Sequence, residues 1–138
     1  MDRQDYSYDP KKVTVAVNGR IITGFSADGI ISMAHNEDAI LPAVGVQGDV
    51  AIAENANNSA VCTLTLMATS ASIAYLRDLC TRKARLRLTI SDVNDDDEIH
   101  VNTENCRIRK MPDMARGREV GSVSVAIYIP DLVYRTAV

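Results

Sequence analysis

The sequence feature that most constrains the fold is a long segment, residues 36–67, whose first part has no steady period. Its branched and aliphatic side chains, such as Ile40, Leu41 and Val50, argue against disorder, since disordered segments are poor in such residues. A small domain rarely carries so long an irregular segment unless the segment has a function. We therefore expect residues 36–58 to form a long loop that binds a partner, with a short strand at residues 50–53 as an option.

The end of this segment has the period of a β-strand, over residues 59–67. Cys62, Leu64 and Leu66 fall on one face, because side chains alternate along a strand, and we expect that face to be buried. The other face carries Thr63, Thr65 and Met67. It is free of charge, which fits contact with another protein surface but also fits the high strand propensity of Thr.

Further short alternating runs are separated by turn signals. Asn18-Gly19 lies between two such runs, and this dipeptide suits the type I′ turn of a hairpin because both residues tolerate positive φ. The last strand has a small, uncharged face with Ser122 and Ser124. The expected strands cover residues 13–17, 20–23, 30–34, 84–91, 99–109 and 120–129.

The strand at residues 99–109 changes its apolar parity between Val101 and Cys106. Residues 102–105 therefore contain a bulge or a bend, or else the two halves of the strand face opposite sides.

One helix is expected, over residues 69–82. Ile73, Leu76 and Leu79 fall at helical spacing and make one apolar face, which is typical of core packing and not of a cofactor site. Either Ser70 or Ser72 can cap its N-terminus.

Together these elements predict a mainly β chain with one α-helix and about seven strands joined by hairpin-type turns. The fold class is an antiparallel β-sandwich or barrel with one flanking helix. A length of 138 residues suits a single domain, residues 1–138, whose polar start forms an N-terminal arm over residues 1–10.

Composition narrows the possible functions. The net charge of -3 gives no general affinity for nucleic acid, and the aromatic share of 4% disfavours a pocket with aromatic walls. No secretory signal and no membrane anchor are expected, because no apolar run has the required length. The three cysteines lack CxxC spacing, so we expect buried free thiols at Cys62, Cys80 and Cys106.

The search for chemistry finds no catalytic motif, and we expect neither an enzyme nor a bound cofactor or metal. His35 followed by Glu37 or Asp38 is the one arrangement that a small hydrolase would use. The acidic run at residues 92–98 fails the EF-hand template, which requires Gly at its sixth place and Glu at its twelfth. A solvated turn is the default for that run, and a partner-facing surface is the other option.

A series of short motifs follows in order through the first half of the chain. They are YDPKKVTV at residues 8–15, VNG at 17–19, ITGF at 22–25, NED at 36–38, GDV at 48–50, NANNS at 55–59 and TLTL at 63–66. Their order resembles the tail tube proteins of long-tailed, contractile-tailed bacteriophages. The tube proteins of type VI secretion and of phage-tail-like bacteriocins are similar.

The resemblance implies a subunit that forms homo-hexameric rings, stacked into a tail tube through which DNA passes into the host cell. In that family a long loop reaches the neighbouring ring, and residues 36–58 hold the matching position. The N-terminal arm joins the same contact. The ring-stacking residues implied in this way are Tyr6, Tyr8, Ile40, Leu41, Val44, Val46, Asp49 and Val50.

The resemblance also implies partners and a location. The partners are further copies of the chain, a sheath protein, a baseplate and tail-terminator proteins, and the location is the virion tail, assembled in the cytoplasm of a bacterial host. The uncharged faces with Thr63, Thr65, Ser122 and Ser124 are expected at the lumen or at a seam between subunits. Deleting residues 43–49 should leave a folded subunit that stacks poorly.

A different class of function remains as the alternative, a soluble β-barrel that binds a small ligand. That function needs a closed barrel around an enclosed cavity.

Overall fold

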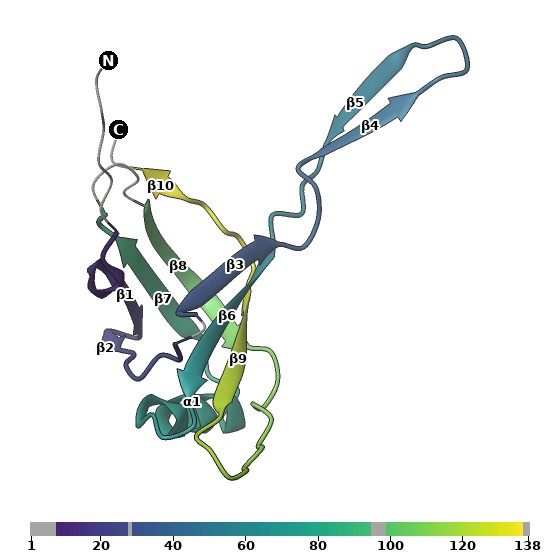
Figure 1. The fold of residues 1–138 in the computed structure, drawn as a ribbon. Helices are drawn as coiled ribbons and strands as arrows, with labels where there is room; N and C mark the ends of the chain where they lie inside the picture. Colours follow the sequence, from purple (N-terminus) through teal and green to yellow (C-terminus); the bar gives the residue numbers. More distant parts are fainter. Residues whose placement is uncertain (1–7, 28, 95–98, 137–138) are drawn as a thin grey trace, which may run out of the picture.

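Two antiparallel β layers face each other in the computed structural model, which describes residues 8–27, 29–94 and 99–136 (Figure 1). The strands are β1 (Val13–Val17), β2 (Arg20–Ile21), β3 (Ile31–His35), β4 (Ile40–Val44), β5 (Val50–Glu54), β6 (Ala60–Met67), β7 (Leu86–Asp92), β8 (Ile99–Ile108), β9 (Ser122–Ile129) and β10 (Arg135–Thr136). The helix is α1 (Ser72–Thr81), and a short 3-10 turn (Pro10–Lys12) precedes β1. This confirms the predicted mainly β class with one helix.

The main sheet runs in the order β2-β1-β7-β8-β9-β6-β3, with β10 added beside the start of β8. Strand β8 connects the two layers: its N-terminal part pairs with β7, and Arg107 and Ile108 at its end pair with β9. The sheet is open, because β2 and β3 lie at its two ends. The fold is thus a sandwich with an open seam and not the closed barrel that the ligand-binding alternative requires.

The parity change in β8 is a bulge, as one of the sequence options predicts. Leu88 pairs with Thr103 and Leu86 with Cys106, so β8 holds one more residue than β7 between these pairs. Asn105, inside the bulge, adopts a left-handed backbone conformation with a φ of 61°. The bulge restores the inward direction of Cys106 and bends β8 into the second layer.

The core lies between the layers, and the predicted alternation of side chains is confirmed. Cys62, Leu64 and Leu66 of β6 are fully buried, as are Leu88 of β7 and Val125 of β9. Helix α1 lies at one end of the sandwich, with Leu76 and Leu79 buried (Figure 1). Among the described helices, none is long and apolar enough to cross a membrane.

The predicted type I′ turn at Asn18-Gly19 is confirmed. Asn18 and Gly19 have φ values of 52° and 81°, as a type I′ turn requires. The Asn18 side chain also accepts a hydrogen bond from the backbone N–H of Arg87, at 2.9 Å.

The expected serine cap of the helix is only partly present. The N-cap position belongs to Ala71, which makes no side-chain cap, although the Ser70 hydroxyl accepts a bond from the Ser72 N–H at 3.2 Å. Both serine side chains form hydrogen bonds with the backbone of Thr23. Ser70 donates to the Thr23 carbonyl at 2.6 Å, and Ser72 accepts from the Thr23 N–H at 3.1 Å.

The expectation of an irregular loop at residues 36–58 was wrong. Strands β4 and β5 form a regular hairpin there, and only the short strand near Val50 was foreseen. The physical reason is that both faces of this hairpin are apolar, so the sequence lacks the polar alternation by which a strand is recognised. Pro42 within β4 adds to the ambiguity, since proline is uncommon inside strands.

A candidate assembly surface on the projecting hairpin

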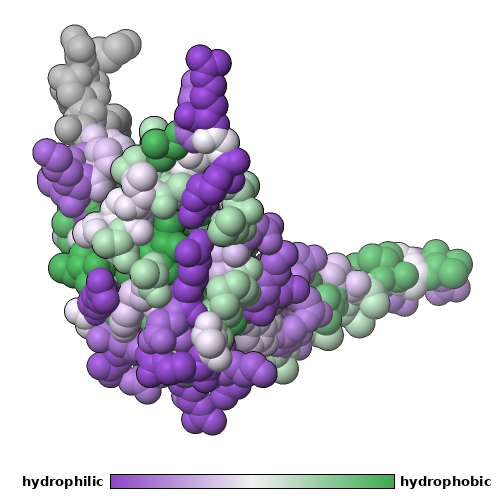
Figure 2. Space-filling model, turned by 90° about the horizontal axis from the view of Figure 1, so that it is seen from below, coloured by the Kyte–Doolittle hydropathy of each residue, from purple (hydrophilic) through white to green (hydrophobic). Residues whose placement is uncertain are grey.

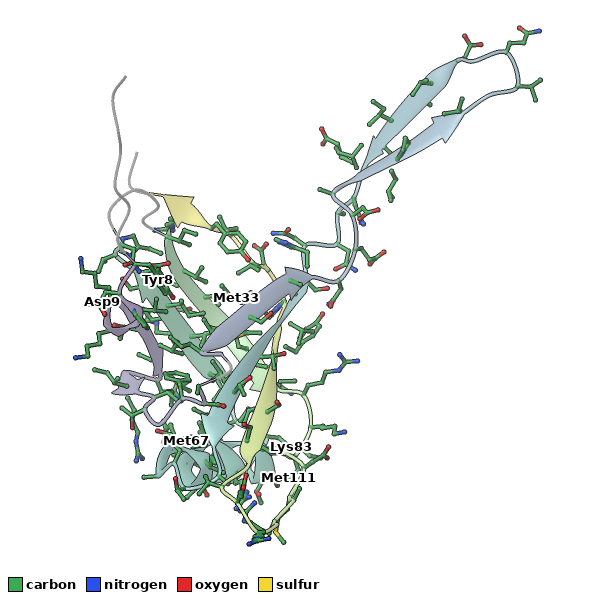
Figure 3. All side chains as sticks on the ribbon, in the orientation of Figure 1. Tyr8, Asp9, Met33, Met67, Lys83 and Met111 are labelled. Carbon is green, nitrogen blue, oxygen red and sulfur yellow. The ribbon has the colours of Figure 1, made fainter. Side chains whose placement is uncertain are left out.

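The β4–β5 hairpin extends away from the sandwich and has no other element beside it (Figures 1 and 3). Every residue of both strands is exposed. Its tip is closed by hydrogen bonds from the Gly45 N–H to the Asp49 carbonyl, at 2.7 Å, and from the Gly48 N–H to the Gly45 carbonyl, at 3.0 Å. Gly48 has a φ of 92°, a conformation that other residues rarely adopt.

Cross-strand pairing sorts the hairpin side chains onto two faces. Val44 lies opposite Val50, and Pro42 opposite Ile52, on a face we call the bulky face. The bulky face comprises Ile40, Pro42, Val44, Val50 and Ile52, with the charged Glu54 opposite Ile40 at the base of the hairpin. The alanine face comprises Leu41, Ala43, Ala51 and Ala53. Since both faces are largely apolar, their exposure to water is unfavourable, and burying either face against another surface would be stabilising.

The bulky face is open in the isolated chain. Val44 is 69% exposed, Ile52 is 65% exposed, and Val46 at the tip is fully exposed. Figure 2 shows hydrophobic residues along the hairpin, where it leaves a body with a largely polar surface. Full burial of one such side chain contributes about 1.5–3 kcal/mol, so the face holds several kcal/mol of association free energy. Contiguous exposed apolar surface of this kind marks an interaction site.

The base of the hairpin is held by a group of amide side chains that we call the asparagine clasp, Asn36, Asn55, Asn57 and Asn58. Asn36 donates to the Ser59 hydroxyl at 2.9 Å, and Asn55 donates to the Asp38 carbonyl at 2.8 Å. Asn58 reaches the chain after β9, with donated bonds to the Asp131 carboxylate at 2.6 Å and to the Leu132 carbonyl at 2.8 Å. The clasp fixes the direction in which the hairpin leaves the body.

His35, Glu37 and Asp38 meet around a shallow pocket at this base, where the side chains of His35 and Glu37 have structural contacts. The His35 ring nitrogen Nε2 lies 3.3 Å from the Leu132 carbonyl, and its ring meets Tyr134 edge-on. Glu37 accepts a hydrogen bond from Asn57. Within the described part of the chain, no carboxylate lies within ion-pair distance of His35.

Other sites considered from the sequence give no metal centre in the described residues. Of the acidic run, Asp92 accepts bonds from Asn94, and Asn94 in turn accepts from the Asp9 N–H at 2.9 Å. Residues 95–98 lie outside the described residues.

The predicted uncharged residues come together on the outer face of β3, β6 and β9. Thr65 pairs with Ser124, Thr63 lies between Ser32 and Ala126, and Met67 pairs with Ser122. The outer face of the other layer differs, because Arg87 and Glu104 form an exposed ion pair there, at 2.7 Å. We call the first surface the uncharged face.

The open seam of the sandwich contains an apolar groove that the sequence did not reveal. It has a volume of about 630 Å³ and lies beside β3. Phe25 and Ile31 line it together with Tyr8, Pro10 and Val13 from the start of the chain, and the polar residues Ser26 and Asp92 lie at its border. Tyr8 is 67% exposed, whereas Tyr6, the other expected contact residue of the arm, lies outside the described residues.

The cysteines are free, as expected, but their burial differs. Cys62 and Cys106 are buried in the core, and Cys80 is half-buried. Burial, together with the neighbouring Cys106, raises the pKa of the Cys62 thiol to about 12. Burial also raises the pKa of Cys106. These two thiols pack as small apolar side chains, since a thiol with a raised pKa is a poor nucleophile.

Comparison with known proteins supports the fold but gives no family. No family model and no curated protein match the chain. Among solved structures, a chain of the anti-feeding prophage cap (the AFP tube terminating cap) matches with a TM-score of 0.61 and 12% identity, over 99% of this chain and 96% of that one.

Two further chains come from an extracellular contractile injection system, PVC, in its extended state. The chain from the sheath/tube terminator has a TM-score of 0.62 and 12% identity, over 95% of this chain and 98% of that one. The chain from the sheath-tube complex has a TM-score of 0.61 and 13% identity, over 96% of this chain and 94% of that one. At such identities the likeness shows a shared fold, and it extends over nearly the whole chain.

Proposed function

We propose that this protein is a structural subunit of a phage-tail-like contractile particle, in which copies of it form stacked rings of the tail tube. The observation that carries the proposal is the hairpin, which is apolar on both faces and exposed along its full length. A chain with such a hairpin is incomplete as a monomer, because several kcal/mol of hydrophobic free energy remain unused. The fold shared with tube, cap and terminator structures supports the same reading.

The proposal assigns different roles to the two surfaces described above. The hairpin, with Ile40, Leu41, Val44, Val46 and Val50, makes the contact between copies in homo-hexameric rings and their stacks. The uncharged face, with Thr63, Thr65, Ser122 and Ser124, lines the lumen. Strands β3, β6 and β9 contain no Lys or Arg, which suits DNA passage, since phosphate contacts from basic side chains would retain the DNA. Arg109 and Lys110 lie beside Ser124 and Ala126 at the border of this face.

The expected surroundings follow from this role. A sheath protein, a baseplate and a terminator are the other components that such a tube contacts, and the particle is built in the bacterial cytoplasm. A tube subunit and a terminator differ in one physical respect: the tube subunit adds to its own rings without limit, whereas the terminator stops at one ring.

Negative-stain electron microscopy of the purified protein over a range of concentrations tests the proposal. We expect rings or tubes from the wild-type chain. The matched variant replaces residues 40–54 by Asn-Gly between Ala39 and Asn55, whose backbones are already joined by a hydrogen bond of 2.9 Å. This variant should fold and remain monomeric.

Four outcomes are informative. Tubes support the tube subunit, and single rings that never stack assign the chain to a terminator. A wild-type chain that stays monomeric at the highest concentration, or a hairpin-less variant that assembles normally, would overturn the proposal.

A further inference from the structure

The two edges of the hairpin are not equivalent. Hydrogen bonds join Gly45 to Asp49 and Asn55 to Ala39, so the odd-numbered residues of β4 bond inward to β5. The even-numbered residues of both strands therefore direct their backbone groups outward. Pro42 is one of them and has no N–H, which interrupts the outer edge of β4. The outer edge of β5 presents Val50, Ile52 and Glu54, each with a backbone donor and acceptor.

A matching edge exists on the body. Strand β3 ends the main sheet, and the opposite end, β2, has only two residues. Asn36 bonds to the Ser59 carbonyl, at 3.0 Å, so the alternate residues Ile31, Met33 and His35 direct their backbone groups away from β6. Within the described part of the chain, the backbone N–H groups of these three residues have no hydrogen-bond acceptor. Three outward residues on β3 thus match three on β5.

The side chains decide the relative direction of the two strands. In an antiparallel ladder, outward residues lie directly opposite each other and share a face. In the register that pairs all three, Ile52 lies opposite Met33, Val50 opposite His35 and Glu54 opposite Ile31, on the side of the sheet where Ile31 and Met33 pack on the core. Ala51 lies opposite Ala34, so the alanine face continues the uncharged face. A parallel ladder would reverse this and place the bulky side chains beside Ser32.

The seam gives the bulky face a place to pack. The groove of about 630 Å³ lies beside β3 and is lined by Phe25, Ile31 and Val13. An antiparallel β5 strand added to β3 extends that layer on the side of the open seam, with the bulky face turned toward the groove. One contact thus satisfies an open sheet edge and covers apolar surface on both partners.

From these features we infer that β5 of one copy adds antiparallel to β3 of a second copy, while the β4 edge, interrupted by Pro42, stays unpaired. The inference rests on the proposed self-assembly and identifies the edge and the partner strand that make it. The contact is heterologous, because the edge on one copy meets a different edge on the next, and such contacts generate rings when the rotation between copies closes.

Disulfide cross-linking of assembled protein tests the pairing directly. In the register that pairs all three outward residues, Ala51 of one copy faces Ala34 of the next in a non-hydrogen-bonded pair, where Cβ atoms lie about 4.5–5.5 Å apart. Ala51→Cys and Ala34→Cys are prepared as separate chains in a Cys80→Ala background, mixed, assembled and oxidised. The matched control is Ala43→Cys, because Ala43 is the cross-strand neighbour of Ala51 on the same face. We expect a dimer band with Ala51→Cys at least tenfold stronger than with Ala43→Cys.

A pair of proline variants tests the edge without a cross-link. Val50 and Val44 are cross-strand partners on the same face, and 61% and 69% of their surface is exposed. Val50→Pro removes an outward N–H from β5, whereas Val44→Pro removes one from the edge that Pro42 already interrupts. We expect the critical concentration for assembly to rise at least tenfold for Val50→Pro and less than threefold for Val44→Pro. Circular dichroism confirms that both variants fold.

Contrary results separate this inference from the proposed function. Assembly that responds equally to both proline variants, or a cross-link through Ala43→Cys, overturns the edge assignment and leaves self-assembly standing. Assembly that requires a second, different protein, with no cross-link between copies, assigns the β5 edge to that protein and overturns the second copy as its partner. A wild-type chain that never assembles overturns both proposals.

Discussion

Placing a charge on the bulky face separates folding from assembly. Ile52 is 65% exposed in the isolated chain, so Ile52→Asp should change the free energy of unfolding by less than about 0.5 kcal/mol. In the proposed assembly a second copy covers the Ile52 side chain. Burial of its remaining surface is worth about 1–2 kcal/mol, and an unpaired carboxylate in its place costs further free energy.

The sum is at least about 3 kcal/mol per contact, which corresponds to roughly a hundredfold change in an association constant. Pelleting of assembled protein over a concentration series measures this effect, because the protein left in the supernatant gives the critical concentration. Urea unfolding of the same samples gives the stability. For Ile52→Asp we expect a large rise in the critical concentration and almost no change in the free energy of unfolding.

The control is Ile21→Asp, since Ile21 is the same residue type, is 60% exposed and lies on β2 of the body. If Ile52→Asp assembles at the wild-type concentration, the hairpin makes no contact. If Ile21→Asp impairs assembly equally, the loss reflects added negative charge and not the hairpin.

Three further predictions concern stability. Gly24→Ala should cost about 2–3 kcal/mol in thermal unfolding, because Gly24 has a φ of 80° and a Cβ would lie 2.7 Å from the Ser70 Cβ; Gly117→Ala, with open space around it, should be nearly neutral. Asn58→Asp should lower stability at neutral pH more than Asn58→Ala, because a carboxylate would face Asp131, and acidification should remove the difference. Between about pH 9 and 12 the Cys62 thiol ionises only in the unfolded chain, so the free energy of unfolding falls as pH rises, by at most about 1.4 kcal/mol per pH unit. Urea unfolding of Cys62→Ala at several pH values should show a dependence of this free energy on pH that is shallower by the same amount.

Sequence patterns predicted the body of this fold well because its longer strands, β1, β6, β7, β8 and β9, each have buried residues on one face. The alternation in β6 identified Leu64 and Leu66 as core residues, and the broken parity of β8 gave a bulge near Asn105 as one of its options. The turn at Asn18 was equally clear, since its dipeptide fits few other conformations.

The hairpin was missed for a related reason. Its apolar content pointed to a partner, but with apolar residues on both faces its sequence lacks the polar alternation by which a half-buried strand is recognised. The roles of Pro42 and Ala51 depend on the register of the hairpin, and the seam groove depends on which strands end the sheet. Such pairing is set by contacts between distant segments, which a single sequence does not display.

The asparagine clasp has a consequence for the angular accuracy of assembly. Strands of five residues and their turn give the hairpin a reach of about 20 Å from its base, so a tilt of about 10° there moves the tip by about 3.5 Å. That sideways displacement is most of the spacing of about 4.8 Å between paired strands, so it would move β5 out of hydrogen-bonding distance of the edge strand proposed to receive it. Short amide side chains bonded to backbone and to Asp131 allow less play than long flexible ion pairs would. In the proposed assembly the clasp therefore acts as an alignment device, through which the core of one subunit sets the position of its hairpin against the next.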